Sequence, residues 1–286
     1  DTHPVRRGGD GMKAAQARVV LGGATGGIGR AVAAQLQRAG AALLLVGRSP
    51  ARLAAQAAVL GPSVPWQVAD LADATARQRL ANAAADWGAN VLVHGAGLPS
   101  FGRLEAIDPA SIAQVITANL VAPIALTQAM LPQLRRQPRA QVICIGSAIG
   151  RLGLPGFSVY AASKFGLRGF AEALRRELAD SPVRVQYLGP RSTRTAFNDA
   201  AVEAYNRATH TAMDDPARVA QALLALLESE RAEAFVGFPE RLAVRLNGLA
   251  PALLDGAFAT HRASLPPPSS SPSPATETAT YAGTPT

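Results

Sequence analysis

The chain has 286 residues, a formal net charge of +8 and a single cysteine, Cys144. This length can bury a sizeable core, and one α/β domain of about 250 residues accounts for it. The arginines are scattered and are not interleaved with aromatic residues, so the charge indicates a diffuse basic surface and argues against a nucleic-acid groove. A single cysteine excludes an internal disulfide, and we therefore predict a reducing, cytoplasmic location.

Both ends of the chain are predicted to lie outside the folded domain. Residues 1–11 lack the apolar core of a signal peptide, and Met12 is a natural start, so 1–11 is interpreted as a disordered lead. Residues 266–286 are rich in Pro, Ser and Thr and are predicted to be disordered. No run approaches the ~20 apolar residues that a membrane-spanning helix requires. The predicted core domain covers residues 12–240.

A short apolar strand, residues 18–22, leads into a glycine-rich turn and then into a helix that Gly40 ends. The turn reads Gly22-Gly-Ala-Thr-Gly-Gly-Ile-Gly29. A strand, a glycine turn and a helix together form the context that a dinucleotide fingerprint requires. Glycines let the backbone approach a pyrophosphate, and the first N–H groups of the helix attract its negative charge. The glycine spacing is one residue wider than in the usual Rossmann pattern.

The second predicted strand, residues 42–47, is followed by Arg48 and Ser49 and by no carboxylate. An acidic residue here would bind the ribose 2′-hydroxyl of NAD, whereas an arginine can hold the 2′-phosphate of NADP. Arg48 therefore favours NADP(H) over NAD(H), although a merely solvated arginine is the alternative. Asp70 follows a third predicted strand near 64–68 and is either a helix cap or an adenine contact.

Strands and helices alternate through the rest of the folded region. Further strands are predicted at residues 91–97, 141–146, 183–188 and 232–237, and helices at 51–60, at 109–136, after 159 and at 216–229. Such alternation predicts an α/β fold of the Rossmann type: a doubly wound, seven-stranded parallel sheet with helices on both faces, in a single domain. Residues 196–213 lack clear periodicity and are interpreted as a mobile cover, and residues 241–265 as a C-terminal helical extension.

Three polar side chains are predicted to converge at one crevice. Ser147 follows a buried strand, and Tyr160 and Lys164 stand four residues apart on the next helix, so they share one face. A free tyrosine has a pKa near ~10, and a neighbouring cation would lower it toward the range of efficient acid–base catalysis. Lys13 and Lys164 are the only lysines among 28 basic residues, which singles out an ammonium group here. For Tyr-x-x-x-Lys alone, a surface pair on a helix is the alternative.

A polar amide, Asn119, interrupts the apolar helix predicted at 109–136 and must find hydrogen-bond partners or cost stability. It either caps a local kink near Pro123 or faces the crevice. Small residues at 95–97, and hydroxyls and cations in the loop 189–195, also follow predicted strands. Ligands of parallel sheets bind beyond the carboxyl ends of the strands, where all of these residues are expected.

Over residues 18–237 the chain resembles the short-chain dehydrogenase/reductase (SDR) family, because several separated motifs occur in the family's order. The glycine turn is similar to the family's cofactor turn, and Ser147 with Tyr-x-x-x-Lys resembles its catalytic set, joined by Asn119 in Thr-Ala-Asn-Leu. The resemblance implies that Tyr160 is the general acid/base. It also implies that Lys164 lowers the pKa of Tyr160 and holds the nicotinamide ribose, that Ser147 orients the carbonyl or alcohol, and that Asn119 supports a proton relay through water.

A cofactor site follows from the same motifs and from the resemblance, and no metal site is predicted. The predicted cofactor-binding residues are Gly23, Thr25, Gly26, Gly27, Ile28, Gly29, Arg48, Ser49, Asp70, Leu71, Gly95, Ala96, Gly97, Tyr160, Lys164, Pro190, Thr193 and Thr195. The chain departs from the family pattern at two positions. His94 replaces the first amide of Asn-Asn-Ala-Gly and is interpreted as structural. Arg191 replaces the glycine of Pro-Gly and either closes on the cofactor phosphates or crowds the site.

These observations predict an NADP-dependent oxidoreductase that exchanges hydride between nicotinamide and a ketone or secondary alcohol. One alternative is a cofactor-binding SDR-like protein without turnover. A second is a membrane-surface reductase of an apolar, lipid-like substrate, suggested by a leucine stripe within 242–253. A terminal helix packed on the core or on a partner subunit explains the same stripe.

The family resemblance also implies a homodimer or homotetramer, paired through the helices near 109–136 and 159–180. The substrate is expected to be a small carbonyl compound or alcohol, and no nucleic-acid partner is expected. No motif encodes the substrate's identity, which the segments 98–104, 148–158 and 196–213 would set.

Overall fold

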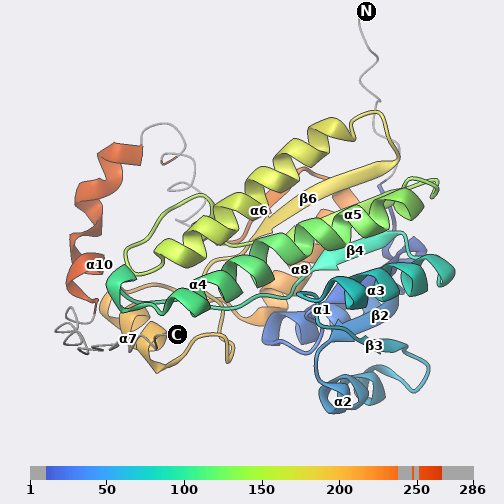
Figure 1. Ribbon diagram of the computed structural model, residues 1–286, viewed down its shortest axis with the longest axis horizontal. Coiled ribbons are helices and arrows are strands. Elements are labelled where there is room, and N and C mark those ends of the chain that lie inside the picture. The colour runs from blue at the N-terminus through green and yellow to red at the C-terminus, as the bar shows by residue number, and fades with distance from the viewer. Residues whose placement is uncertain (1–10, 238–246, 248–250, 266–286) are drawn as a thin grey trace, which may run out of the picture.

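The computed structural model describes residues 11–237, 247 and 251–265. Seven parallel strands form one sheet in the order β3-β2-β1-β4-β5-β6-β7, with helices on both faces (Figure 1). The strands are β1 (Arg18–Gly22), β2 (Ala42–Gly47), β3 (Trp66–Val68), β4 (Val91–His94), β5 (Ala140–Ile145), β6 (Val183–Gly189) and β7 (Glu233–Phe235). The predicted doubly wound, seven-stranded α/β fold is confirmed.

Helices connect the strands and cover the two faces of the sheet. The α-helices are α1 (Gly27–Arg38), α2 (Pro50–Leu60), α3 (Ala74–Asp86), α4 (Pro109–Ile116), α5 (Ala122–Leu134), α6 (Ser158–Glu177), α7 (Ala200–Ala208), α8 (Pro216–Ser229) and α10 (Ala259–Ala263). α1 packs against α8 on one face, and α3 packs against α5, beside α6, on the other. Each face buries its own apolar cluster, because strands covered on both sides carry apolar residues in both directions.

The sheet reverses its winding direction where β1 pairs with β4. Val20 and Leu92, which are partners across this pair, are fully buried. In a parallel sheet such a switch point leaves a crevice beyond the carboxyl ends of the strands. The glycine turn after β1 and the small residues after β4 therefore lie side by side at this crevice.

Two helices, α3 and α7, are absent from the sequence prediction. The buried face of α3 consists largely of alanines with Leu80, so its apolar stripe is weak in the sequence. Asp73 begins this helix by accepting a hydrogen bond from the Ala76 N–H at 2.6 Å. Asp199 begins α7 in the same way, accepting from the Val202 N–H at 2.8 Å. The segment 196–213, interpreted as a mobile cover because it lacks clear periodicity, therefore contains a helix that the sequence analysis missed.

The apolar helix before β5 runs from Pro109 to Leu134, with a π-helical turn at Thr117–Val121 that joins α4 to α5. By length and composition alone it could cross a membrane, since its most apolar window has a mean hydropathy of 1.5. The sequence analysis expected no segment apolar and long enough to cross a membrane, and this helix corrects that expectation. In the fold α5 packs against α3 and contacts the sheet, and core helices of α/β proteins satisfy the same criterion.

The described end of the chain lies over α7. A 3₁₀ segment, Pro251–Phe258, leads into α10, which contacts α7. Figure 1 shows this segment at one end of the molecule, beyond the start of α6. The predicted extension 241–265 is helical in this part. Residues 241–246 and 248–250, and with them most of the leucine stripe, lie outside the described residues, as do 1–10 and the predicted tail 266–286.

Candidate active site

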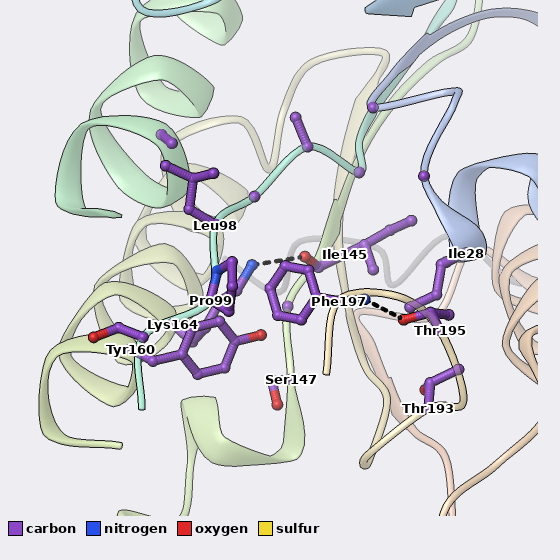
Figure 2. Close-up of a pocket in the computed structure, with 18 of the residues that line it drawn as sticks. Ile28, Leu98, Pro99, Ile145, Ser147, Tyr160, Lys164, Thr193, Thr195 and Phe197 are labelled. Atoms are coloured by element: carbon purple, nitrogen blue, oxygen red, sulfur yellow. Dashed lines mark hydrogen bonds between the residues drawn. The ribbon is translucent and has the colours of Figure 1, made fainter. Parts of the chain in front are cut away.

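A cavity of about 730 Å³ opens beyond the carboxyl ends of the strands. The predicted residues that line it are Gly23, Thr25, Gly26, Gly27, Ile28, Gly29, Arg48, Asp70, Leu71, Gly95, Ala96, Gly97, Ser147, Tyr160, Lys164, Pro190, Thr193 and Thr195. Ser49 and Asn119 are not among the lining residues. In the view of Figure 2, Ser147, Tyr160 and Lys164 are grouped below Leu98, with Thr195 to their right.

One end of the cavity, here called the glycine half, is lined by residues 23, 25–29, 46–48, 52, 69–72 and 95–97. Gly23 has a φ of +71°, and a Cβ there would come within 2.5 Å of the Ala96 nitrogen. Only glycine adopts this conformation without strain. The backbones of β1 and β4 therefore approach closely and leave a shallow cradle that side chains would fill.

The N-terminus of α1 faces this cradle without a cap of its own. The helix begins at Gly27, its N-cap Gly26 has no side chain, and no acidic residue stands in the first turn. Its first N–H groups therefore remain available to an anion. Arg48 and Arg52 line the same half, and Arg52 also donates to the Thr25 carbonyl at 2.7 Å. Backbone donors and two arginines match the chemistry of a phosphate-bearing dinucleotide.

Two predicted cofactor contacts have identifiable local roles. The Ser49 hydroxyl accepts a hydrogen bond from the Arg52 N–H at 3.3 Å and so begins α2. The Asp70 carboxylate accepts from the Ala72 N–H at 3.0 Å within a turn, while Asp73 is the cap of α3. Asp70 is therefore not the helix cap that the sequence allowed, and it lines the glycine half.

Ser147, Tyr160 and Lys164 meet at the centre of the cavity, as the sequence predicts. Ser147 follows β5 and begins a 3₁₀ turn, where its Oγ accepts from the Ile149 N–H at 3.1 Å. The Tyr160 phenol has a side-chain hydrogen bond with Ser147. Lys164 is buried, and its Nζ lies 5.6 Å from the Tyr160 ring centre and donates to the Ile145 carbonyl at 3.4 Å (Figure 2).

Burial dominates the acid–base properties of this centre. It raises the pKa of Tyr160 to about 12, although the hydrogen bond with Ser147 acts in the opposite direction. Burial also lowers the pKa of Lys164 to about 8. The sequence predicts that the neighbouring cation lowers the pKa of Tyr160, whereas in the fold desolvation raises this pKa and Lys164 is not among the causes of the shift. At neutral pH the phenol therefore carries a proton, and Lys164 is largely cationic.

The comparisons with known proteins give the family. The model for short chain dehydrogenases matches residues 17–206. The bovine dehydrogenase/reductase SDR family member 7B (Bos taurus) is 34% identical over 257 residues, which are 82% of this chain and 78% of that protein. This chain belongs to the short-chain dehydrogenase family.

Solved members of the family share the fold. The Shigella flexneri short chain dehydrogenase complexed with NADP has a TM-score of 0.67 at 27% identity, over 76% of this chain and 95% of that one. The Burkholderia phymatum protein in complex with NAD has a TM-score of 0.74 at 23% identity, over 82% and 94% of the two chains. Nicotinamide cofactors of both kinds thus bind to proteins of this fold.

In this short-chain dehydrogenase Asn119 lies behind the cavity wall, fully buried in the π-helical turn. Its amide exchanges two hydrogen bonds with the backbone of Leu98, at 2.7 and 2.9 Å, and donates to Ser163 Oγ at 3.1 Å. Ser163 in turn donates to the Tyr160 carbonyl at 2.7 Å. Asn119 therefore connects the chain after β4 to the helix that carries Tyr160. The π turn near it, and not a cap near Pro123, is the local irregularity.

The two departures from the family pattern are both internally paired. His94 is buried and hydrogen-bonded to Thr127 Oγ1 at 2.8 Å, and burial, aided by the charge of Lys164, lowers its pKa to about 3. Its role is structural, as predicted. Arg191 lies 2.7 Å from a carboxylate oxygen of buried Asp214. Arg191 is also among the residues lining the cavity, where this ion pair holds its guanidinium against Asp214.

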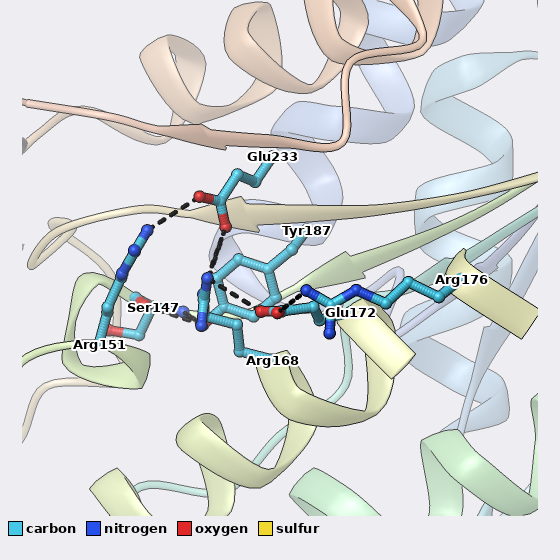
Figure 3. A network of polar contacts seen from close by, with 7 residues as sticks. All are labelled: Ser147, Arg151, Arg168, Glu172, Arg176, Tyr187 and Glu233. Carbon is cyan, nitrogen blue, oxygen red and sulfur yellow. Dashed lines mark hydrogen bonds and ion pairs between the residues drawn. The ribbon is translucent and has the colours of Figure 1, made fainter. Parts of the chain in front are cut away.

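A chain of ion pairs connects the elements around the turn after β5 (Figure 3). Glu233 on β7 binds Arg151 at 2.9 Å and Arg168 at 3.2 Å, and Glu172 binds Arg168 at 3.2 Å and Arg176 at 2.6 Å. These groups are partly exposed, so each pair contributes at most about 1 kcal/mol. Together they join the 3₁₀ turn, α6 and β7.

The other end of the cavity is here called the aromatic half. The sequence analysis predicted the segments that form it but not the individual residues. The aromatic half is formed by residues 98–101, 149–157 and 197–211, within the segments that the sequence assigns to the substrate. Phe101, Phe157, Phe197 and Tyr205 line it. Their only sequence signal is that aromatic residues, rare in this chain, occur in each of the three segments. Among the described residues, no three or more His, Cys, Asp or Glu side chains gather as a metal site would require.

Proposed function

We propose that this short-chain dehydrogenase is an NADP-dependent oxidoreductase that exchanges hydride between nicotinamide and a ketone or secondary alcohol. The observation that carries the proposal is the convergence of Ser147, Tyr160 and Lys164 beside the glycine half of the cavity. The cradle at Gly23 and the uncapped start of α1 fit the pyrophosphate of a dinucleotide. When bound, the nicotinamide supplies or accepts the hydride.

Ser147, Tyr160 and Lys164 have different roles in the proposed proton transfer. In the direction of reduction, Ser147 Oγ donates a hydrogen bond to the carbonyl oxygen and Tyr160 Oη gives its proton to the same oxygen. The high pKa of Tyr160 keeps that proton available at neutral pH. The Lys164 ammonium stabilises the phenolate left behind, since a cation favours the charged form of a neighbouring acid. The reverse reaction returns the proton from the alcohol to Tyr160.

The preference for NADP rests on the end of β2. Arg48 and Arg52 line the cavity there, and the acidic residue nearest in this half is Asp70, on the next strand end. Arginines suit a 2′-phosphate, whereas NAD-binding folds usually place a carboxylate after the second strand. Family members bind NAD as well as NADP, so this preference is a proposal about the present residues.

The proposed oligomer is a homodimer or homotetramer. Val121, Ile124 and Phe165, which are 47%, 37% and 42% exposed, give the helices before and after β5 an apolar outer surface, which supports pairing between subunits. Sedimentation at micromolar protein should show a dimer or larger species, and a monomer would refute the proposal. The lipid-surface alternative and the cytoplasmic location stay predictions.

Substitution of Tyr160 by phenylalanine tests the role of the phenol. We expect Tyr160→Phe to lower kcat for ketone reduction by a factor of about 10² to 10⁴, the usual contribution of a general acid. The Kd for NADPH should change less than about twofold, because the ring is retained. Unchanged turnover would remove Tyr160 from the mechanism and favour the alternative of a cofactor-binding protein whose chemistry is lost.

A further inference from the structure

The aromatic half of the cavity surrounds the catalytic phenol with rings. Tyr160 lies between Phe197, at 6.0 Å between ring centres, and Phe157, at 6.4 Å. Phe157 in turn contacts Phe101 at 4.8 Å and Tyr205 at 5.5 Å. Edge-to-face and tilted rings of this kind present both π faces and C–H edges to a guest. A substituent on the reacting carbonyl carbon would therefore meet aromatic walls.

Tyr205 contributes its ring to this wall and keeps its hydroxyl away from it. Its Oη contacts the Pro155 carbonyl at 3.2 Å and His261 Nδ1 at 2.6 Å. A phenol has one proton, so both contacts are satisfied when Tyr205 donates to Pro155 and His261 donates to Tyr205. Burial raises the pKa of Tyr205 to about 12, which keeps this proton in place.

The end of the chain encloses the aromatic half from outside. His261 on α10 packs on the Tyr205 ring with 5.4 Å between centres, and Phe258 packs beside Leu152. A Cβ on Gly156 would come within about 2.5 Å of Leu265 and 2.8 Å of Phe101, so these groups meet at that glycine. The 3₁₀ segment and α10 thereby cover Tyr205 and the loop at Gly156, whereas Phe197 on the other side of Tyr160 is 38% exposed.

Charged groups are confined to other parts of the cavity. Among the described lining residues the charged ones are Arg48, Arg52 and Asp70 in the glycine half, Lys164 at the centre, and Arg191 in its pair with Asp214. The amides of Asn198 and Asn206 donate to the Thr193 carbonyl and to Ser192 Oγ. An anionic group in the aromatic half would lose its hydration without gaining a cation, which is costly.

We propose that the substrate is an uncharged ketone or secondary alcohol whose carbinol carbon carries an aromatic ring or a compact apolar group of similar size. The ring packs against Phe101, Phe157 and Tyr205 while its oxygen reaches Ser147 and Tyr160. This proposal rests on the proposed function, because it takes Tyr160 as the point at which the substrate oxygen is held. Keto acids, phosphorylated sugars and thioesters of charged carriers are excluded from this half.

A binding experiment tests the proposal without turnover. A secondary alcohol cannot react with the reduced cofactor, so calorimetry on the NADPH-loaded protein measures binding alone. The probes are 1-phenylethanol, its para-carboxylate and 2-propanol. We expect the neutral aryl alcohol to bind at least 30-fold more tightly than either of the others. Equal or tighter binding of the carboxylate, or no binding of the aryl alcohol, would overturn the proposal.

Two variants on one loop supply the matched control. Phe101→Ala should weaken binding of the aryl alcohol at least tenfold, whereas Leu104→Ala, at a side chain that is 57% exposed and outside the cavity lining, should leave it unchanged. Unchanged binding of the aryl alcohol by the Phe101→Ala protein would show that the Phe101 ring does not contribute to the substrate site. If the aryl alcohol binds as expected but no ketone is reduced, the proposed function fails and the assignment of the aromatic half survives.

A second, independent observation concerns Tyr187 on β6. Its Oη accepts a hydrogen bond from the Ser147 N–H at 3.0 Å and donates one to the Ser147 carbonyl at 2.9 Å (Figure 3). Burial raises the pKa of Tyr187, so the phenol retains the proton that the second bond requires. A Cβ on Gly146 or Gly150 would overlap this hydroxyl. One phenol thus holds both backbone groups of the residue that orients the substrate.

We infer that Tyr187 is a positioning residue for Ser147. Tyr187→Phe keeps the ring and deletes both hydrogen bonds, and we expect kcat to fall at least fivefold with the Kd of NADPH unchanged. In a Ser147→Ala background the same substitution should change kcat less than twofold, because the hydroxyl to be positioned is gone. An equal loss in both backgrounds would indicate a general structural role, and no loss in either would show that the contact has no effect on catalysis.

Discussion

The two halves of the cavity differ in the kinds of groups that line them. The glycine half is lined by glycine-rich segments at the ends of β1, β2, β3 and β4 and at the start of α1, and it includes the exposed residues Gly26, Arg48 and Asp70. The aromatic half consists of side chains from three separate segments and is enclosed by the last described helix. Backbone geometry near strand ends recurs wherever the fold recurs, whereas side chains on loops vary freely. The proposed cofactor cradle and the proposed substrate wall therefore come from different parts of this chain.

The largest effect is expected from a methyl group in the glycine half. Gly23→Ala places a Cβ against the Ala96 nitrogen at a φ of +71°, so strain and overlap act together. We expect the Kd for NADPH to rise by a factor of about 1,000 in fluorescence titrations. Gly153→Ala, in a loop of the aromatic half with open space around it, is the control and should bind NADPH normally. Similar NADPH affinities of the Gly23→Ala and Gly153→Ala proteins would contradict the proposal that the backbone at Gly23 binds the cofactor.

The next effect concerns Asp214, which holds the loop between the two halves. Its carboxylate is 3% exposed and pairs with Arg191 at 2.7 Å and Arg218 at 3.0 Å. Asp214→Asn leaves Arg191 facing a neutral amide, and such a loss typically costs about 3 kcal/mol in the free energy of unfolding. Urea denaturation measures this loss in the free energy of unfolding. The exposed pair of Glu203 with Arg207 offers a control, since Glu203→Gln should change stability by less than about 0.5 kcal/mol.

Cofactor preference should depend on Arg48 and leave the aromatic half unaffected. A charge-assisted hydrogen bond contributes about 2 kcal/mol, so Arg48→Ala should weaken NADPH binding by roughly 30-fold and leave NADH binding unchanged. Fluorescence titration with each nucleotide measures this difference. Arg38→Ala, an exposed arginine at the end of α1, controls for the general loss of positive charge. Equal weakening of both nucleotides by Arg48→Ala would argue against a 2′-phosphate contact.

The smallest effect is a pH dependence of stability from His94, behind the glycine half. Its pKa is lowered to about 3 in the fold, against 6.5 unfolded. The unfolded chain therefore binds more protons between these values, and stability present above pH 6.5 is lost as the pH falls. Between pH 6.5 and 5.5 we expect a loss of about 1 kcal/mol that His94→Asn abolishes. The exposed His210→Asn should retain this acid dependence, and if it too abolished the loss, the assignment to His94 would be wrong.

Sequence reasoning succeeded where interactions are local. The strand, glycine turn and helix from Arg18 to Arg38 were predicted because their residues are neighbours in the chain. Tyr160 and Lys164 share a helix face by spacing alone. In contrast, α3 escaped prediction because alanine gives little apolar contrast, and the position of Asn119 was undecided because its partners, Leu98 and Ser163, are 21 and 44 residues away.

The sequence by itself determined the α/β class, the order of the strands, and the residue types that meet at the strand ends, but not the helices α3 and α7. The tertiary structure alone decided three things: that burial raises the pKa of Tyr160, that Arg191 is paired with Asp214, and that aromatic rings lie on two sides of the Tyr160 phenol. The reason is physical. Helix and strand periodicity depend on nearby residues, whereas desolvation, ion pairing and cavity shape depend on segments that only folding brings together.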